Sequence, residues 1–223
     1  GEEPPLHYLS QVDSQKVQTG YELITIGRSR NPKGKKSKRI SKHFVCIDCH
    51  NTVIDYEFDE SKIFTSIEKL KTSNTPFLPG STFKGMVNRK TWYNDDYQDK
   101  YGDLATSSKD TLENAIQLCA TVCSQGRRLD NWEMEVIMHY LWSNELHLSD
   151  LNTKADFTPN DNATSNTEKL ALLNNSYLSA YSAKFLPPLP VAERKNGANG
   201  NIEEGQYIYD KSCLTCHNSK KGP

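Results

Sequence analysis

Apolar residues follow the spacing of an amphipathic helix in a segment near the middle of the chain. Asp110-x-x-Glu113 has the form of a capping box, and the helix that it begins is expected to end before Gly126. Apolar positions three or four residues apart form one face of this helix: Leu112, Ile116, Cys119, Val122 and Cys123. The pattern predicts that this face is buried.

A second segment with the same pattern follows. Asp130-x-x-Glu133 has the same capping form and precedes a predicted helix that continues through Trp142. Its buried face is expected to consist of Trp132, Val136, Ile137, Tyr140 and Leu141. No run of 18 apolar residues occurs anywhere, so the sequence predicts no transmembrane helix.

Two copies of one cysteine motif carry the most specific chemistry in the chain. The segments Cys46–His50 and Cys213–His217 both read C-x-x-C-H, the motif that attaches c-type haem. Its two cysteines bind the haem as thioethers, and its histidine takes one axial position on the iron, here His50 and His217. The cysteines of the two motifs are Cys46, Cys49, Cys213 and Cys216. The sequence therefore predicts two c-type haems.

The alternatives to haem are a zinc site of four thiolates and redox-active thiol pairs. Zinc ribbons place their cysteine pairs roughly 15–20 residues apart, whereas here well over a hundred residues lie between Cys49 and Cys213. Haem is favoured for a second reason. Apolar residues make up only 35% of the 223 residues, and two porphyrins would add large apolar surfaces to a thin core.

Covalent haem attachment takes place outside the cytoplasm, in the oxidising space where disulfides persist. We therefore expect a periplasmic or cell-surface protein. The segment 1–5 lacks the basic and apolar pattern of a signal peptide, so the sequence reads as a mature chain.

Charge is balanced over the chain, with a net charge of −1, but not along it. One block without any acidic residue holds eight cations: Arg28, Arg30, Lys33, Lys35, Lys36, Lys38, Arg39 and Lys42. Overall neutrality argues against a dedicated nucleic-acid-binding protein. The block is either a solvated loop or an electropositive collar for an anion, such as a haem propionate, an oxyanion substrate or an acidic partner.

Composition divides the chain into four parts. Residues 1–18 form a polar lead-in, 19–150 a first haem domain, 151–204 a polar strap and 205–223 the start of a second haem segment. Within the first domain Leu78–Asn88 contains one proline and two glycines, and we expect it to be a loop that crosses a haem edge. Gly205-x-x-x-Tyr209 has the form of the short helix that precedes the haem motif in ordinary cytochromes c.

The second axial ligand of the first haem sets its potential and reactivity. The candidates are Cys119, Cys123, Met86, Met134, Met138 and His139. Met86 lies in the glycine-containing loop. Cys119 and Cys123 lie one helical turn apart, and they could equally be two buried thiols or an oxidised pair. A thiolate ligand would lower the potential of the haem and would suit a site where sulfur itself reacts.

Several of these segments together resemble dihaem thiosulfate dehydrogenases, which are related to the SoxA sulfur-oxidising cytochromes. The similar stretches are 20–24, the basic block, 46–50, 114–129, 135–141 and 205–217. In that family a cysteine ligand precedes a glycine by seven residues in the pattern C-x-x-x-x-x-x-G-x-x-L, which Cys119, Gly126 and Leu129 match. Cys123 falls where the family more often has serine. The segment between His50 and Cys119 is longer than in the family.

The resemblance implies an all-α, class I cytochrome c-like fold and two haems that exchange electrons with other redox proteins. It also implies, as the alternative to a pure electron carrier, an enzyme that oxidises thiosulfate to tetrathionate or reduces tetrathionate. In that reaction a substrate sulfur would engage Cys119. From their charge alone, Arg89 and Arg127 are expected to hold the anionic substrate.

The second haem segment is expected to stop before a distal ligand of its own. Segments below ~40 residues rarely fold without covalent or metal support, so we expect a remote histidine to serve the second haem. The candidates are His7, His43, His139 and His147. His7 is of most interest, because from a lead-in it could reach its own chain or a neighbour and link subunits into a haem chain. Otherwise His7 is an ordinary surface histidine.

Overall fold

The computed structural model describes residues 4–53, 78–93, 95–147, 150, 165, 167–168, 190–193, 200–214 and 217. Within these residues the chain is helical, and β-type pairing is limited to two isolated bridges, Arg30 with Lys36 and His50 with Gly80. The expected all-α class is confirmed for this part of the chain. No helix in it is both long and apolar enough to cross a membrane.

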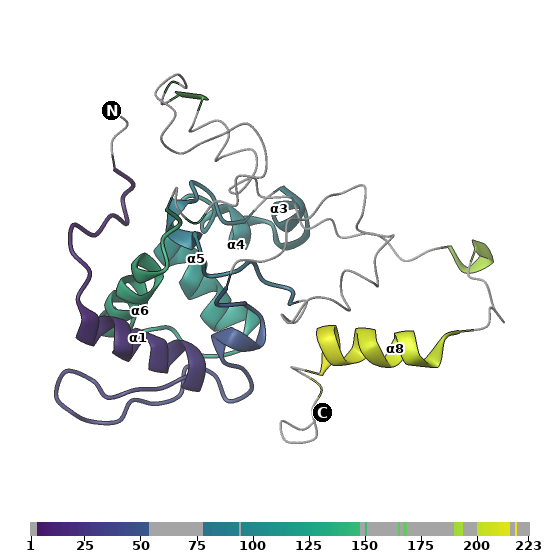
Figure 1. The fold of residues 1–223 in the computed structure, drawn as a ribbon, viewed down its shortest axis with the longest axis horizontal. Helices are drawn as coiled ribbons and strands as arrows, with labels where there is room; N and C mark the ends of the chain where they lie inside the picture. Colours follow the sequence, from purple (N-terminus) through teal and green to yellow (C-terminus); the bar gives the residue numbers. More distant parts are fainter. Residues whose placement is uncertain are drawn as a thin grey trace.

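Figure 1 shows how the helices are arranged. The α-helices of the described residues are α1 (Ser14–Ile26), α3 (Asp95–Tyr101), α4 (Asp103–Thr106), α5 (Leu112–Leu118), α6 (Asn131–Ser143) and α8 (Ile202–Ile208). Short 3-10 turns lie at Cys46–Asp48, Met86–Asn88 and Val191–Glu193. Two π-helical turns extend α5 and α8, at Cys119–Cys123 and Tyr209–Cys213.

Helix α1 was not predicted from the hydrophobic pattern, although its two ends carry strong signals. The Asp13 carboxylate accepts the backbone N–H groups of Gln15 and Lys16, which caps the first turn. Gly27 ends the helix in the left-handed conformation, with φ at 76°, and donates its N–H to the Leu23 carbonyl. Because α1 begins at Ser14, the expected boundary between residues 18 and 19 falls inside a helix.

Helices α1 and α6 lie side by side and form the main contact of the fold (Figure 1). They approach closely at Gly20, where a Cβ atom would lie 2.1 Å from the Val136 carbonyl oxygen and 2.9 Å from Tyr140 Cβ. Leu23 and Ile24 follow one turn later on α1 and are completely buried. A glycine at the crossing therefore lets the two backbones meet and bring these side chains into the core.

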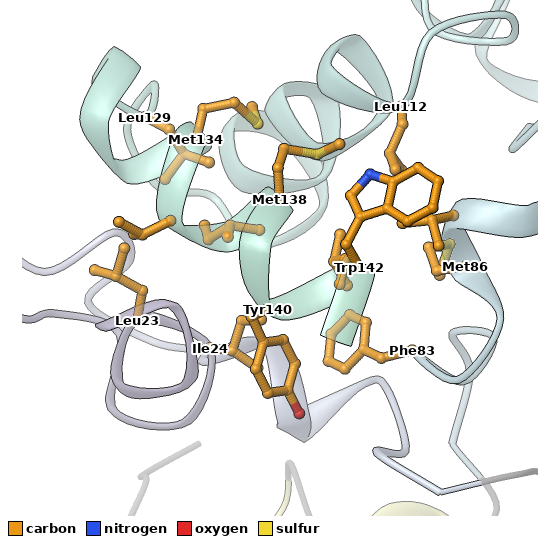
Figure 2. Close-up of a cluster of buried hydrophobic side chains, with 14 of the residues drawn as sticks. Leu23, Ile24, Phe83, Met86, Leu112, Leu129, Met134, Met138, Tyr140 and Trp142 are labelled. Atoms are coloured by element: carbon orange, nitrogen blue, oxygen red, sulfur yellow. The ribbon is translucent and has the colours of Figure 1, made fainter. Parts of the chain in front are cut away.

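Helix α6 confirms the second predicted helix. Its first turn is capped as expected, since the Glu133 carboxylate accepts the Asp130 N–H at 2.9 Å. Figure 2 shows the side chains of Met134, Met138, Tyr140 and Trp142 extending from this helix into the hydrophobic cluster. Of the predicted face, Trp132 is half-buried and the other four residues are buried. Residues on the other sides of α6 are buried as well, because further elements pack against it.

The first predicted helix exists, with two differences. Thr111 rather than Asp110 precedes its first residue, and no side chain caps that end. The helix also widens into the π-helical turn Cys119–Cys123, where the Ser124 N–H bonds the Cys119 carbonyl five residues back. A π-turn holds more residues than an α-turn, so the later positions rotate away from the predicted face. Val122 is consequently 41% exposed and Cys123 is exposed.

Helix α8 confirms the short helix expected before the second motif. The Asn201 side chain caps it by accepting the N–H groups of Glu203 and Glu204. Because α8 begins at Ile202, the expected boundary between residues 204 and 205 lies within it. Most of the expected strap, residues 151–204, lies outside the described residues.

Candidate functional site

The first haem motif forms a compact turn. The buried Asp48 carboxylate accepts the Val45 N–H at 2.8 Å, and the His50 N–H donates to the Cys46 carbonyl at 3.0 Å. Cys46 and Cys49 are half-buried, and neither takes part in a disulfide. Burial, together with repulsion from Cys49, raises the pKa of the Cys46 thiol to about 12. Burial therefore keeps the Cys46 sulfur in its protonated form.

The loop that was predicted to cross a haem edge contacts the histidine of the motif. His50 Nδ1 lies 2.7 Å from the Ser81 carbonyl oxygen and donates its proton to it, and the imidazole stacks on Phe83 with ring centroids 4.9 Å apart. A protonated Nδ1 leaves the lone pair of the neutral ring on Nε2. This arrangement fixes the tautomer and orientation that an axial iron ligand requires.

Gly80 makes this approach possible. A Cβ atom there would lie 2.4 Å from His50 Cε1 and 2.5 Å from His50 Nδ1. The Gly80 N–H also donates to the Cys49 carbonyl at 2.8 Å. The backbone hydrogen bond from Gly80 to Cys49 thus joins the loop to the motif beside the imidazole. Any larger residue at position 80 would displace the ring.

Cys119 interacts electrostatically with the motif cysteines. Its thiol shares a hydrogen bond with Cys123, and this bond, burial and repulsion from neighbouring thiolates raise the pKa of Cys119. Cys46 and Cys49 contribute the weakest part of this repulsion. The fold therefore couples the charge of Cys119 to that of residues about seventy positions earlier in the chain.

Cys123 and Tyr93 extend this group of side chains. The bond from Cys119 lowers the pKa of the Cys123 thiol, and a second bond from Tyr93 acts in the same direction. The Tyr93 hydroxyl also lies 3.3 Å from the Ala115 carbonyl oxygen, an alternative acceptor for its one proton, and burial raises the pKa of the phenol. Tyr93 was missed by the sequence analysis, because nothing in its local pattern indicates a contact with α5.

The other proposed ligands of the first haem have different surroundings. Met86, Met134 and Met138 are buried in the hydrophobic cluster of Figure 2. His139 accepts the Asp13 N–H on Nδ1 at 3.1 Å, at the start of α1. Among these candidates Cys119 has the electrostatic interaction with Cys46 and Cys49 described above, and the identity of the distal ligand stays a prediction.

The basic block is a structured loop that projects beyond α1 and α6 (Figure 1). Asn31 closes its tip by accepting the N–H groups of Lys33 and Lys35, and Gly34 takes a positive φ of 76°. Its second half is tied to the segment after the π-helical turn: the Ser41 hydroxyl donates to the Ser124 carbonyl at 2.7 Å. The cations of the block are thereby anchored to the helix that carries Cys119.

Arg127 has a structural role that differs from the expected one. Its guanidinium donates five hydrogen bonds, two of them to the Glu133 carboxylate and three to the carbonyls of Lys38, Arg39 and Arg128. A guanidinium has five N–H donors, so Arg127 has none left for a substrate. This placement argues against the expected anion-binding role. Arg89 is half-buried beside the Met86–Asn88 turn, and its expected role stays a prediction.

The second motif shares one backbone hydrogen bond with the first. The His217 N–H donates to the Cys213 carbonyl at 2.9 Å, as the His50 N–H does to the Cys46 carbonyl. The Tyr209 hydroxyl donates to the His217 carbonyl at 2.7 Å. Cys216 lies outside the described residues.

His7 is neither exposed nor part of a loose lead-in. It is 6% exposed, with Nε2 2.9 Å from the Val87 carbonyl oxygen and its ring packed against Trp92 and Trp142. Trp142 also donates its indole N–H to the His7 carbonyl at 2.8 Å. The interpretation of His7 as an ordinary surface histidine is wrong, because aromatic rings enclose it. Its role as a ligand of the second haem stays a prediction.

The donor set contains groups that can ligate the iron of a c-type haem. In the described residues no three or more His, Cys, Asp or Glu side chains are grouped to hold a metal ion. A haem needs only axial donors from the protein, and the oriented His50 imidazole and the Cys119 sulfur are of that kind. Comparison of the chain with protein-family models, curated proteins and solved structures finds no match.

Proposed function

We propose that this chain is a dihaem c-type cytochrome that transfers electrons outside the cytoplasm. The observation that carries the proposal is the setting of His50, whose Nδ1–H is held by the Ser81 carbonyl in the same turn as the half-buried Cys46 and Cys49. Cys46 and Cys49 would bind the first haem covalently, and Cys213 and Cys216 the second. The proposed fold is that of a class I cytochrome c.

The chain's own residues would determine how the first haem behaves. The Ser81 carbonyl makes the His50 imidazole a stronger electron donor by accepting a hydrogen bond from its Nδ1–H. The Phe83 ring and the contact with Gly80 hold the imidazole in one orientation. A haem bound there would supply a one-electron redox couple. Cys119, if it held the haem as a thiolate, would lower its potential by donating charge.

The haem content of the purified protein tests the proposal. After expression with the machinery for covalent haem attachment, mass spectrometry of the denatured chain should show the mass of two haems. Replacing Cys46 and Cys49 with alanine should remove one of them. Cys123→Ala is the matched control, since this cysteine lies outside both motifs and should leave both haems. A denatured chain without bound haem would refute the proposal.

A second candidate function is oxidation of thiosulfate to tetrathionate, or the reverse, at the first haem. The observation that favours it is the electrostatic interaction of the half-buried Cys119 sulfur with Cys46 and Cys49. In such an enzyme Cys119 would engage the substrate sulfur, and the anchored basic loop would attract the anion. Thiosulfate-dependent reduction of a dye by wild type, abolished in Cys119→Ala, would support it. Absence of turnover in both directions would leave the electron carrier.

A further inference from the structure

Two thiols touch each other at the end of α5. Cys119 and Cys123 are hydrogen-bonded through their side chains within the π-helical turn. Cys119 is half-buried, whereas Cys123 is exposed to solvent. The pair therefore has one sulfur that a small reagent can reach and one sulfur that faces the interior of the domain.

The backbone at this point is compatible with a disulfide. Cys119 and Cys123 are the first and last residues of one π-helical turn, and their side chains are hydrogen-bonded to each other, so the two sulfurs already lie within reach of each other. The turn is also the last of its helix, because the chain leaves it through Gln125 with a positive φ of 52°. A bond between the two sulfurs would thus require adjustment only at a helix end.

We propose that Cys119 and Cys123 form a reversible dithiol–disulfide pair that low-molecular-weight disulfides oxidise. The exposed Cys123 sulfur attacks a disulfide R–S–S–R, breaks its S–S bond and releases one thiol. The Cys119 sulfur then attacks the mixed disulfide on Cys123 and displaces the second thiol. One protein disulfide forms, one reagent disulfide is reduced, and two protons and two electrons leave with the two R–SH molecules.

The pair would control the first haem site, a consequence that rests on the proposed function. If Cys119 donates its thiolate to the iron, oxidation of the pair removes that anionic donor. Cys123 would act through Cys119 and would not touch the cofactor itself. The oxidising compartment expected for the protein is one in which such disulfides persist. A change in the surrounding thiol–disulfide balance would then change the ligand of the first haem.

Oxidised glutathione is a suitable probe, and one tryptic peptide reports the result. Cleavage after Lys109 and Arg127 gives peptide 110–127, which contains Cys119 and Cys123 and no other cysteine. After incubation of the holoprotein with the probe and alkylation in denaturant, we expect this peptide to be two hydrogens lighter and unalkylated. Excess reduced glutathione should restore two alkylated cysteines. Alkylation of both cysteines after oxidation, or two stable glutathione adducts, would overturn the proposal.

Two single variants test the order of attack. In Cys119→Ser we expect a glutathione adduct to accumulate on Cys123, because no second sulfur displaces it. In Cys123→Ser the half-buried Cys119 should react much more slowly, by at least tenfold. Equal rates for the two variants would contradict the assignment of Cys123 as the first thiol. Both readouts are masses of one peptide, so they do not depend on activity.

The electron paramagnetic resonance spectrum separates this proposal from the proposed function. If Cys119 ligates the first haem, formation of the disulfide should replace a thiolate-type low-spin signal, and reduction should restore it. A disulfide that forms in peptide 110–127 without any spectral change would support the thiol pair and would overturn Cys119 as the ligand. Loss of the disulfide itself would overturn the pair while leaving the haem count unaffected.

Discussion

Arg127 forms a bidentate ion pair with Glu133, whose carboxylate is completely buried at the start of α6. The two hydrogen bonds measure 2.7 and 2.6 Å, and Glu133 also accepts the Asp130 N–H. Since Arg127 also donates to the carbonyls of Lys38 and Arg39, this one guanidinium joins the basic loop to the first turn of α6. The loop is therefore held by the core of the domain.

Removing this guanidinium should destabilise the domain strongly. Arg127→Ala leaves the Glu133 carboxylate buried without its partner, and breaking a buried ion pair in this way costs about 3–5 kcal/mol. Urea unfolding followed by circular dichroism would measure the loss. Glu135→Ala is the control, because its ion pair with Lys16 is exposed and should contribute little. A loss in Arg127→Ala no larger than in this control would contradict the structural role.

The crossing of α1 and α6 predicts that Gly20→Ala is poorly tolerated. The new Cβ would lie 2.1 Å from a backbone oxygen of α6, so the helices must separate. Overpacking of this kind costs about 1–3 kcal/mol or more, and the thermal midpoint should fall. Gly205→Ala is the matched control, because its Cβ would meet no atom within 4 Å. Unchanged stability of Gly20→Ala would show that the helices do not meet at this residue.

Gly80→Ala should act on His50 rather than on the fold as a whole. A Cβ atom 2.4 Å from the imidazole would push the ring away from the Ser81 carbonyl. In the proposed dihaem protein, the first haem should then lose its low-spin absorption spectrum at least in part, while the mass of two haems is retained. The exposed neighbour Pro79, replaced by alanine, provides the control. An unaltered spectrum in Gly80→Ala would contradict the contact.

Stability should fall as the pH falls below the ordinary pKa of histidine, because of His139. Burial lowers the pKa of His139 below the ordinary histidine value of 6.5, and the positive charge of Lys16 lowers it further. The negative charges of Glu135 and Asp13 oppose this shift. The unfolded chain therefore takes up this proton at a higher pH than the folded chain does. Stability is present above the unfolded pKa and is lost as the pH falls toward the folded pKa.

The slope from one such proton is at most about 1.4 kcal/mol per pH unit. We expect His139→Gln, which keeps an acceptor for the Asp13 N–H, to flatten the dependence between pH 7.5 and 5. Asp13 does not interfere in this range, because its own pKa is lowered from 3.8 and its contribution is lost only at lower pH. Urea unfolding over the series would measure the slope. An unchanged slope in His139→Gln would contradict the contribution of this residue.

Local sequence patterns predicted the parts of the fold that depend on neighbours along the chain. The helix at α6 was predicted with its cap and its buried face, since capping and helical periodicity act over a few residues. The loop at 78–88 and the helix before the second motif followed from glycine, proline and motif spacing in the same way. The two haem motifs are also local, so the residues expected to hold haem could be named from the sequence.

Local patterns did not predict α1, although Asp13 and Gly27 mark its ends. Its hydrophobic pattern is weak because only a narrow face, around Gly20 and Leu23, is buried against α6. The π-helical turn was missed for a related reason. A regular helical period places Cys123 on the buried face, whereas one wide turn carries it to the surface.

The amino-acid sequence by itself determined the two C-x-x-C-H motifs, the helical class and the candidates for a distal ligand of the proposed haem. Only the tertiary structure decided that Cys119 shares a hydrogen bond with Cys123 and interacts with Cys46, that His7 is enclosed by Trp92 and Trp142, and that Arg127 binds Glu133. Each of these relationships joins side chains on different elements. They depend on how α1, α5 and α6 pack together, and packing is a property of the whole domain that no single segment encodes.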